Sequence, residues 1–253
     1  MYKIIKISAI AIALVAFSSC KNEQKSDKNQ DVAELEVMAQ ETTEVTGGEV
    51  MTKEMQDELT PDGVLQSLKE GNTRFVNNEL TPRNKSKQVI NTAGGQYPEA
   101  VILSCLDSRV PVEKVFDRGI GDLFVARVAC NFSNVDILGS MEFACKVSGA
   151  KVVVVLGHQS CGGIRAAVDD VKLGNITAML QKIKPAVALV DYDGEKTSVN
   201  SDFVAMVCER NVHNTINDIR KNSPILKEME DNDEIKIVGA VYNVENGNVE
   251  WLS

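Results

Sequence analysis

The chain has 253 residues, of which 43% are hydrophobic and 25% are charged, and its formal net charge at pH 7 is -9. This length and composition suit one large globular domain with additional segments. The acidic balance argues against a surface for nucleic acid or anionic lipid, because phosphate recognition needs clustered Lys and Arg. We therefore expect no nucleic-acid partner.

The first residues predict an exported protein with a lipid anchor. A short cationic start, MYKIIK, precedes the apolar stretch ISAIAIALVAF, which is short for a bilayer span, and SSC follows it. This ending resembles the signal of bacterial lipoproteins, in which the cysteine, here Cys20, is acylated and becomes the mature N-terminus; Phe17 replaces the usual Leu. The resemblance implies a signal peptide over residues 1–19 and a location in the bacterial cell envelope, on the periplasmic face or the cell surface. The alternative, an uncleaved anchor, also places the domain outside the cytoplasm.

Residues 20–58 predict a flexible acidic tether. They consist mainly of Glu, Asp, Lys, Gln, Thr and Gly, and no aromatic residue occurs between Lys21 and Glu58. Such a segment is too polar to bury a core of its own. We therefore expect a disordered tether over 20–58 and one folded domain over 59–253.

Helices and apolar strands alternate in the predicted domain. Thr60 is a predicted helix N-cap, with Pro61 at the first helical position. Continuous apolar runs of strand length lie at 99–105, 122–129 and 151–158. Strands without polar alternation, separated by helical segments, indicate a parallel sheet that is covered on both faces.

The C-terminal part of the chain completes the predicted fold. Helical patterns lie near 174–190 and 201–222, and Asn246 and Gly247 between two β-rich runs predict a hairpin. The predicted fold class is therefore α/β, with a central, mostly parallel sheet flanked by helices and an antiparallel hairpin at its C-terminal edge.

Two of the predicted strands end in residues that carry chemistry. AVILSCLDSRV ends in Cys105, Asp107 and Arg109, and VVVVLGHQSCGG ends in His158 and Cys161. The carboxyl ends of parallel strands converge in one crevice, so both cysteines and the histidine are expected to meet. Two thiolates and one imidazole suit Zn²⁺, and three protein ligands leave its fourth tetrahedral position open, as catalytic sites require. Water bound at such a position becomes much more acidic.

The carboxylate and the guanidinium beside the first cysteine have a predicted catalytic role. Asp107 and Arg109 lie on the same side of an extended chain, so they are expected to form a bidentate pair. The pair would fix one carboxylate oxygen to orient a zinc-bound hydroxide. With Arg109 turned away, Asp107 would instead occupy the fourth zinc position and block the reaction.

Other interpretations of these residues stay open on the sequence alone. Cys105 and Cys161 would form a disulfide in an oxidising compartment, although the five cysteines that remain beside Cys20 are an odd number. Asp107 and Arg109 would then be only a structural salt bridge. His213 is either a proton relay or a solvated helical side chain.

The order of the two motifs supports a family resemblance. CLDSRV followed by GHQSCGG resembles the β-class carbonic anhydrases, whose pattern is C-x-D-x-R and then H-x-x-C, and EGNTRFV, GDLFVARVACN and EFA match further. The resemblance implies one Zn²⁺ per subunit on Cys105, His158 and Cys161, with Asp107 and Arg109 as the catalytic dyad. It implies reversible hydration of CO₂ to bicarbonate and a proton.

The same resemblance implies substrate-binding residues and an oligomer. Gln96 matches a glutamine that binds substrate across a dimer interface, Phe124 matches an apolar wall of the pocket, and Gly162 follows the last ligand as the pattern requires. A homodimer or a dimer of dimers is therefore expected. Members switched by bicarbonate carry Trp where Ile102 stands here, so we expect no such switch.

The chain departs from the family pattern at two positions near the motifs. Leu106 replaces a usual Ser, and Cys130 stands where Gly or Ala is common.

Two further functions remain as alternatives. The same zinc site would hydrolyse CS₂ or COS, or the protein would be a catalytically silent zinc-binding surface lipoprotein.

Overall fold

The computed structural model describes residues 47–252, so the predicted signal peptide, Cys20 and most of the predicted tether lie outside the described residues. The strands are β1 (Ala100–Ser104), β2 (Leu123–Arg127), β3 (Val152–His158), β4 (Lys236–Tyr242) and β5 (Val249–Trp251). The α-helices are α2 (Lys53–Asp57), α3 (Pro61–Val76), α4 (Lys85–Thr92), α5 (Val112–Val115), α6 (Val135–Glu142), α7 (Gly162–Val168), α8 (Gly174–Leu180), α9 (Lys184–Leu189), α10 (Ser201–Asn222) and α11 (Pro224–Asp231). A 3₁₀ turn, η1 (Ala129–Asn131), and a π-helical turn, η2 (Phe143–Val147), complete the description. Within 47–252, no helix has the length and apolar character needed to cross a membrane.

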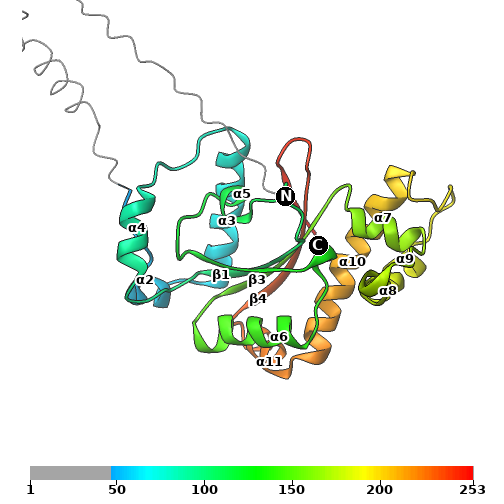
Figure 1. Cartoon of the computed structure of the whole chain (residues 1–253). Coiled ribbons are helices and arrows are strands. Elements are labelled where there is room, and N and C mark those ends of the chain that lie inside the picture. Colours follow the sequence, from blue (N-terminus) through cyan, green and yellow to red (C-terminus); the bar gives the residue numbers. More distant parts are fainter. Residues whose placement is uncertain (1–46, 253) are drawn as a thin grey trace, which may run out of the picture. The chain divides into compact units, whose positions relative to one another are not determined.

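One sheet forms the centre of the domain (Figure 1), and its strand order is β2-β1-β3-β4-β5. The first four strands are parallel, and β5 runs antiparallel to β4. The apolar runs of β1 and β3 are buried at every position, as expected for parallel strands covered on both faces. Gly247 has a φ of 82° in the turn between β4 and β5, which confirms the predicted hairpin. The predicted fold class is confirmed.

Three groups of side chains form the core around this sheet. Val101, Leu103 and their neighbours in β3 pack against α6, α10 and α11 on one face. Ile102 and the alternate residues of β3 pack against α3 and α5 on the other face. A third cluster lies between α7, α8, α9 and α10, and it includes Cys105 and Cys161 (Figure 1). The side chains beyond the carboxyl ends of β1 and β3 are therefore held by a packed helical layer.

The helix boundaries follow local capping chemistry. The Thr60 side chain accepts a hydrogen bond of 3.1 Å from Gly63 N, and Pro61 begins α3, as predicted. The predicted helix at 201–222 is α10. The pattern at 174–190 divides into α8 and α9, because Pro185 has no N–H for the carbonyl of Gln181 and its ring would clash there.

The prediction of a disordered tether that continues to residue 58 is wrong for residues 47–58. The Gln56 side chain is 1% exposed, and its Nε2 donates hydrogen bonds of 2.8 Å to the carbonyls of Pro98 and Ser148. Asn84 N donates to the carbonyl of Gly47 at 2.9 Å. Polar composition excludes an apolar core but not this anchoring, because buried amide hydrogen bonds stabilise the segment instead.

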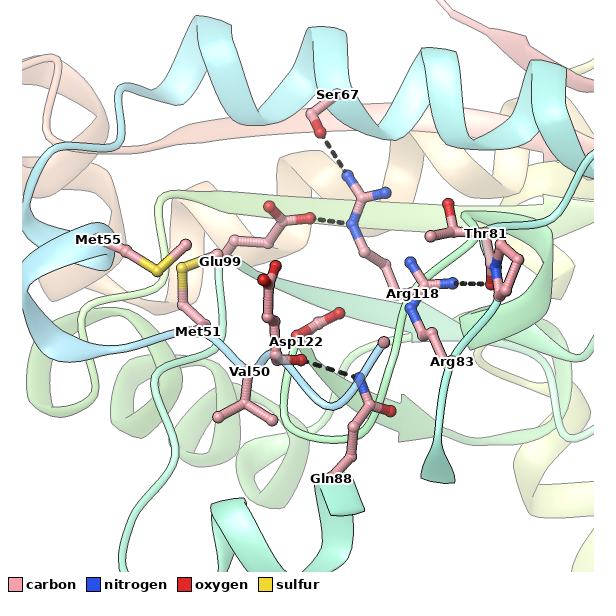
Figure 2. A pocket seen from close by; sticks show the side chains of 13 residues that line it. Val50, Met51, Met55, Ser67, Thr81, Arg83, Gln88, Glu99, Arg118 and Asp122 are labelled. Carbon is pink, nitrogen blue, oxygen red and sulfur yellow. Dashed lines mark hydrogen bonds and ion pairs between the residues drawn. The ribbon is translucent and has the colours of Figure 1, made fainter. Parts of the chain in front are cut away.

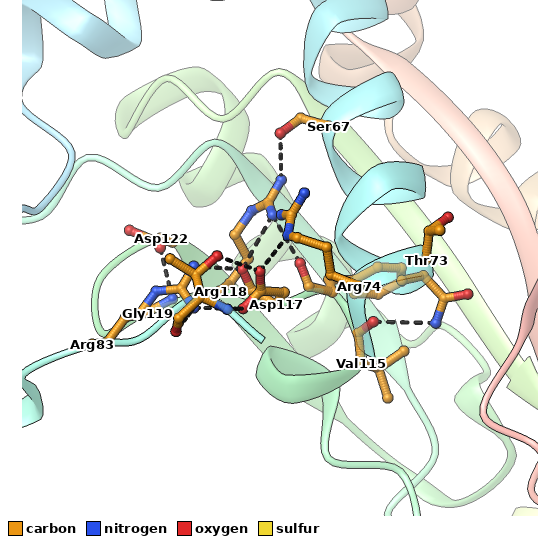
Figure 3. Close-up of polar contacts among 12 residues, drawn as sticks. Ser67, Thr73, Arg74, Arg83, Val115, Asp117, Arg118, Gly119 and Asp122 are labelled. Carbon is orange, nitrogen blue, oxygen red and sulfur yellow. Dashed lines mark hydrogen bonds and ion pairs between the residues drawn. The ribbon is translucent and has the colours of Figure 1, made fainter. Parts of the chain in front are cut away.

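A polar network lies at the amino-terminal edge of the sheet, next to this segment. Glu99, just before β1, pairs with Arg118, and their side chains are 6% and 7% exposed. They line a cavity of about 290 Å³ together with residues of the 47–55 segment (Figure 2). Asp117 accepts hydrogen bonds from Arg74 and Arg83 (Figure 3), and it also accepts one from Thr81. These ion pairs fix the loop that leads into β2.

Candidate metal centre and active site

Three side chains with metal-binding atoms meet beyond the ends of β1 and β3. The two strands are neighbours, and Ser104 pairs with Leu156. Cys105 follows the last residue of β1, His158 ends β3, and Cys161 is the N-cap of α7. Their ligand atoms all lie within 4.8 Å of one another, and all three residues are buried. The structure therefore brings together the three predicted ligands.

The histidine in this cluster is oriented for metal binding. Its Nδ1 lies 2.9 Å from the carbonyl oxygen of Gln159, to which a protonated Nδ1 donates, so Nε2 carries the free lone pair. His158 Nε2 is buried and has no hydrogen-bond partner in the described residues. Bond lengths of about 2.0–2.3 Å to a tetrahedral Zn²⁺ place ligand atoms about 3.3–3.8 Å apart, so a small contraction of the cluster suffices. The residues present therefore fit Zn²⁺.

Both thiols of the cluster hold their protons tightly unless a cation is bound. Contact with the Cys161 thiol and burial raise the pKa of Cys105 to about 12. For Cys161, contact with Cys105 lowers the pKa, but the Cys130 thiol and burial raise it to about 11. The N–H of Cys130 donates to Cys105 Sγ at 3.2 Å and favours its thiolate. A divalent cation would displace both protons, since the thiolate is the ligand form.

Asp107 and Arg109 form the predicted bidentate pair at the mouth of the cluster. Arg109 Nε donates to Asp107 Oδ1 at 2.9 Å, and Arg109 Nη2 donates to Oδ2 at 2.8 Å. These bonds hold the pKa of Asp107 well below its usual range. Asp107 Oδ2 lies 3.7 Å from His158 Nε2, so the carboxylate borders the cluster. The side chain of Asp107 is 18% exposed and that of Arg109 is 50% exposed, so the site opens to solvent here.

Two residues that the sequence analysis did not assign hold this site in shape. Arg127, at the end of β2, donates at 3.3 Å to the carbonyls of Cys105 and Asp107 and also bonds the carbonyl of Val110. Asn211 in α10 is 3% exposed and donates at 2.8 Å to the carbonyl of Cys130. A lone charge at the end of an apolar strand and an amide in a helix are the sequence signals for Arg127 and Asn211, but neither signal identifies the group that the side chain binds.

The predicted substrate-binding residues do not all lie at this site within one chain. Gly162 is exposed and directly follows Cys161 at the start of α7. Gln96 is exposed and precedes β1. Phe124 lies on β2 and pairs with Val101 near the start of β1. Val101 is four residues before Cys105, which is about 13 Å along a strand. Gln96 and Phe124 therefore lie near the amino-terminal ends of the strands, whereas the cluster lies at the carboxyl ends.

The other titratable candidates have ordinary structural surroundings. His213 lies on α10 with a side chain 33% exposed, and its Nε2 is 3.8 Å from Glu209 Oε1. Cys145 packs in the core beneath the sheet, and Cys208 donates to the carbonyl of His158 at 3.2 Å. All five cysteines within 47–252 are free thiols.

The fold and the site define an α/β protein with a candidate metal-dependent active site at the carboxyl edge of a parallel sheet. A family profile described as carbonic anhydrase matches residues 100–249. Carbonic anhydrase 2 of Mycobacterium tuberculosis is 36% identical over 195 residues, which cover 74% of this chain and 90% of the relative. The carbonic anhydrase of Mycolicibacterium smegmatis is 31% identical over 201 residues, 76% of this chain and 94% of the relative. The Coccomyxa β-carbonic anhydrase in complex with acetazolamide has the same fold, with a TM-score of 0.59 and 20% identity over 75% of this chain and 84% of that chain.

The chain therefore belongs to the β class of the carbonic anhydrase family, a family of enzymes. The family resemblance inferred from the two motifs is confirmed.

Proposed function

We propose that this protein reversibly hydrates CO₂ to bicarbonate and a proton at one Zn²⁺ held by Cys105, His158 and Cys161. The observation that carries the proposal is the cluster of three ligand atoms within 4.8 Å, bordered by the Asp107–Arg109 pair. The relatives named carbonic anhydrase support the same reaction.

Each residue of the site has a defined part in this reaction. Zn²⁺ bound here would acidify a water molecule and so make it a better nucleophile. Asp107 Oδ2 presents an acceptor beside the cluster and orients a water hydrogen, which aims the water's lone pair at the carbon of CO₂. Arg109 holds that carboxylate in place and keeps it ionised. The product proton leaves through the open side of the site to solvent buffer.

The proposal predicts activity that rises between neutral and alkaline pH. Two thiolates donate more charge than neutral imidazoles do, so a bound water loses its proton at higher pH than on a three-histidine site. We expect stopped-flow CO₂ hydration by the zinc-loaded full-length chain to climb from about pH 6 to about pH 9. Equal rates at both pH values would contradict this. Cys161→Ser should abolish both zinc binding and activity, whereas Cys145→Ser should retain both.

The same assay separates the alternative functions. Rates measured with CS₂ and COS beside CO₂ test whether the pocket favours another cumulated substrate. Stoichiometric zinc without hydration of any of the three would indicate a zinc-binding lipoprotein without catalysis. The paired and oriented Asp107–Arg109 dyad supports catalysis, because metal capture alone has no use for it.

We further propose a homodimer, alone or as a dimer of dimers, in which Gln96 and Phe124 of one protomer complete the site of its partner. Within one chain both residues lie near the amino-terminal ends of the strands, away from the cluster at the carboxyl ends. Phe124 lines an apolar groove of about 650 Å³ beside the free edge of β2. Phe143 and Val135 on this groove are 52% and 79% exposed. A second copy would cover these side chains and the unpaired strand edge.

We propose that acylated Cys20 anchors the protein in the bacterial cell envelope. The support is the lipoprotein-like ending of the first 20 residues. Cells grown with an alkyne-labelled fatty acid should label the parent chain and not Cys20→Ala. Labelling of the variant, or a soluble parent, would overturn the anchor without bearing on the reaction.

A further inference from the structure

A fourth thiol lies directly behind the three-ligand cluster. Cys130 Sγ is 3.7 Å from Cys161 Sγ, and the two form a thiol–thiol hydrogen bond. Cys130 is 1% exposed and Cys161 is 3% exposed. The set of ligand atoms within 4.8 Å of one another contains Cys105, His158 and Cys161 but not Cys130. Cys130 is therefore in contact with one ligand without being placed to bind the same ion.

The backbone around Cys130 is built to bring its sulfur to this position. Its φ is 62°, a left-handed conformation that is strained for a residue with a side chain. Asn211 fixes this turn through the Cys130 carbonyl at 2.8 Å. A Cβ on Gly163 would lie 2.1 Å from Cys130 Sγ, so the sulfur lies against the first turn of α7, which begins after Cys161. Glycine at 163 thus leaves room for the Cys130 thiol.

We propose that Cys130 and Cys161 form a reversible disulfide on oxidation by peroxide, which removes Cys161 from the metal site and releases the ion. The inference rests on the proposed function in so far as Cys161 is a zinc ligand. The sulfurs need to approach by only about 1.7 Å to reach a disulfide bond length. Of the cysteines outside the ligand cluster within 47–252, Cys208 bonds the carbonyl of His158 and Cys145 lies in the core beneath the sheet, so Cys130 is the one that contacts a cluster sulfur through its thiol.

The chemistry balances with hydrogen peroxide as the oxidant. The Cys161 sulfur attacks one peroxide oxygen, the O–O bond breaks, and water leaves, so Cys161 becomes a sulfenic acid. The Cys130 sulfur then attacks the Cys161 sulfur, an S–S bond forms, and a second water leaves. In total the two thiols lose two electrons and two protons, and one peroxide becomes two waters. A dithiol reductant reverses the oxidation and restores the ligand.

This arrangement protects the site from irreversible damage. A sulfenic acid without a neighbouring thiol reacts with more peroxide to give sulfinic acid, which reductants do not reverse. Cys130 intercepts the sulfenic acid at contact distance, before a second peroxide arrives. The protein therefore loses its metal under peroxide but regains it after reduction.

The test treats the zinc-loaded full-length chain with hydrogen peroxide and follows two readouts. A chromophoric chelator reports released zinc, and mass spectrometry of a non-reducing digest reports linked peptides. The parent and Cys145→Ser should release zinc, show the Cys130–Cys161 linkage, and rebind zinc after dithiothreitol and zinc are added. Cys130→Ser should show no such linkage, and its recovered zinc binding should fall at least about fivefold, because its Cys161 is oxidised further.

Each other result has a defined meaning. In the parent, a Cys105–Cys161 linkage or no linkage at all would overturn the proposal, and so would a recovery of zinc binding in Cys130→Ser equal to that of the parent. Cys130→Gly replaces Cys130→Ser if the serine variant fails to fold, since glycine accepts the left-handed backbone. A parent that carries no zinc before peroxide is added would refute the proposed function, while the linked peptide would still report on the disulfide.

Discussion

The two carboxylate oxygens of Asp107 have different surroundings, and the difference assigns their roles. Oδ1 accepts from both the backbone N–H and Nε of Arg109, each at 2.9 Å. Oδ2 accepts from Nη2 of Arg109 and faces His158 Nε2 at 3.7 Å. Oδ1 is therefore occupied by Arg109, and Oδ2 keeps a lone pair directed to the ligand cluster. Turning the Arg109 side chain away would free Oδ2 and leave Oδ1 bonded to the backbone N–H of Arg109.

Replacing the bidentate guanidinium of Arg109 tests this assignment of the two oxygens. We expect Arg109→Lys to lower kcat for CO₂ hydration about 100-fold with unchanged zinc content, because an ammonium makes one point contact and leaves the carboxylate free to turn. Stopped-flow rates and zinc analysis measure the two quantities. Arg220→Lys is the matched control, since Arg220 pairs with Glu230 on α10 and α11. A value of kcat for Arg109→Lys within about twofold of the parent would show that the guanidinium does not position Asp107.

Residue types and spacing predicted the metal-binding cluster but not the residues that support it. Cys105 and His158 were assigned because both follow uninterrupted apolar strands, and neighbouring parallel strands end at one edge of a sheet. The role of Cys130 depends on its left-handed φ and on Asn211, which is 81 residues away in the chain. No local pattern encodes such a contact, because it forms only when α10 packs against the sheet.

At the scale of elements, the loop between α5 and β2 is held by one buried carboxylate. The Asp117 side chain is 0% exposed and pairs with Arg74 and Arg83 (Figure 3), and it also accepts a hydrogen bond from Thr81. Burial by itself would raise the pKa of Asp117, but these three partners lower it to about 2. The loop leads directly into β2, whose Arg127 holds the chain segment that carries Asp107. Stability of this loop is therefore coupled to the geometry of the site.

Asp117→Asn should destabilise the protein at neutral pH and not at strongly acidic pH. Removing one partner of a buried ion pair costs roughly 3 kcal/mol. The pKa of Asp117 is lower in the folded state than its ordinary value, so its stabilisation is complete above about pH 4 and is lost as the pH falls through about 2. Urea unfolding at neutral pH and near pH 3 measures the difference between parent and variant. A difference that stays constant over this range would contradict the linkage.

A surface carboxylate provides the comparison for that experiment. Asp231 pairs with Lys227 one helical turn away, and its side chain is 57% exposed. Asp231→Asn should leave the unfolding midpoint unchanged, because an exposed ion pair contributes little. Equal destabilisation by the two variants would mean that charge alone, and not burial, decides the effect.

At the scale of the whole molecule, the position of the predicted substrate residues was not apparent from the sequence. The family resemblance assigns Gln96 and Phe124 to the substrate pocket. In the structure, however, both lie near the amino-terminal ends of the strands, and Cys105 lies at the carboxyl end of β1. Sequence order states which strand a residue belongs to and which end it is near, but not what a second copy brings to it. Composition was similarly misleading for 47–58, where hydrogen bonds from Gln56 replace apolar burial.

Disrupting the apolar groove beside β2 tests the assembly. We expect Phe143→Asp to yield monomers that bind zinc normally but lose at least about tenfold in kcat/KM, because a charge on a buried interface opposes association. Light scattering after size-exclusion chromatography measures the mass. Val199→Asp is the control, since Val199 is 82% exposed and does not line the groove. A monomeric variant with full activity would show that each chain completes its own pocket.

The anchored segment 47–58 separates the start of the domain from the ligand cluster. Gly47 and Glu49 line the same cavity as Glu99 and Asp122. Glu99 and Asp122 stand just before β1 and β2 (Figure 2). The chain thus enters the domain near the amino-terminal ends of the strands, whereas the ligand cluster lies at their carboxyl ends. A carrier attached at Gly47 would therefore leave the mouth of the cluster open to small solutes.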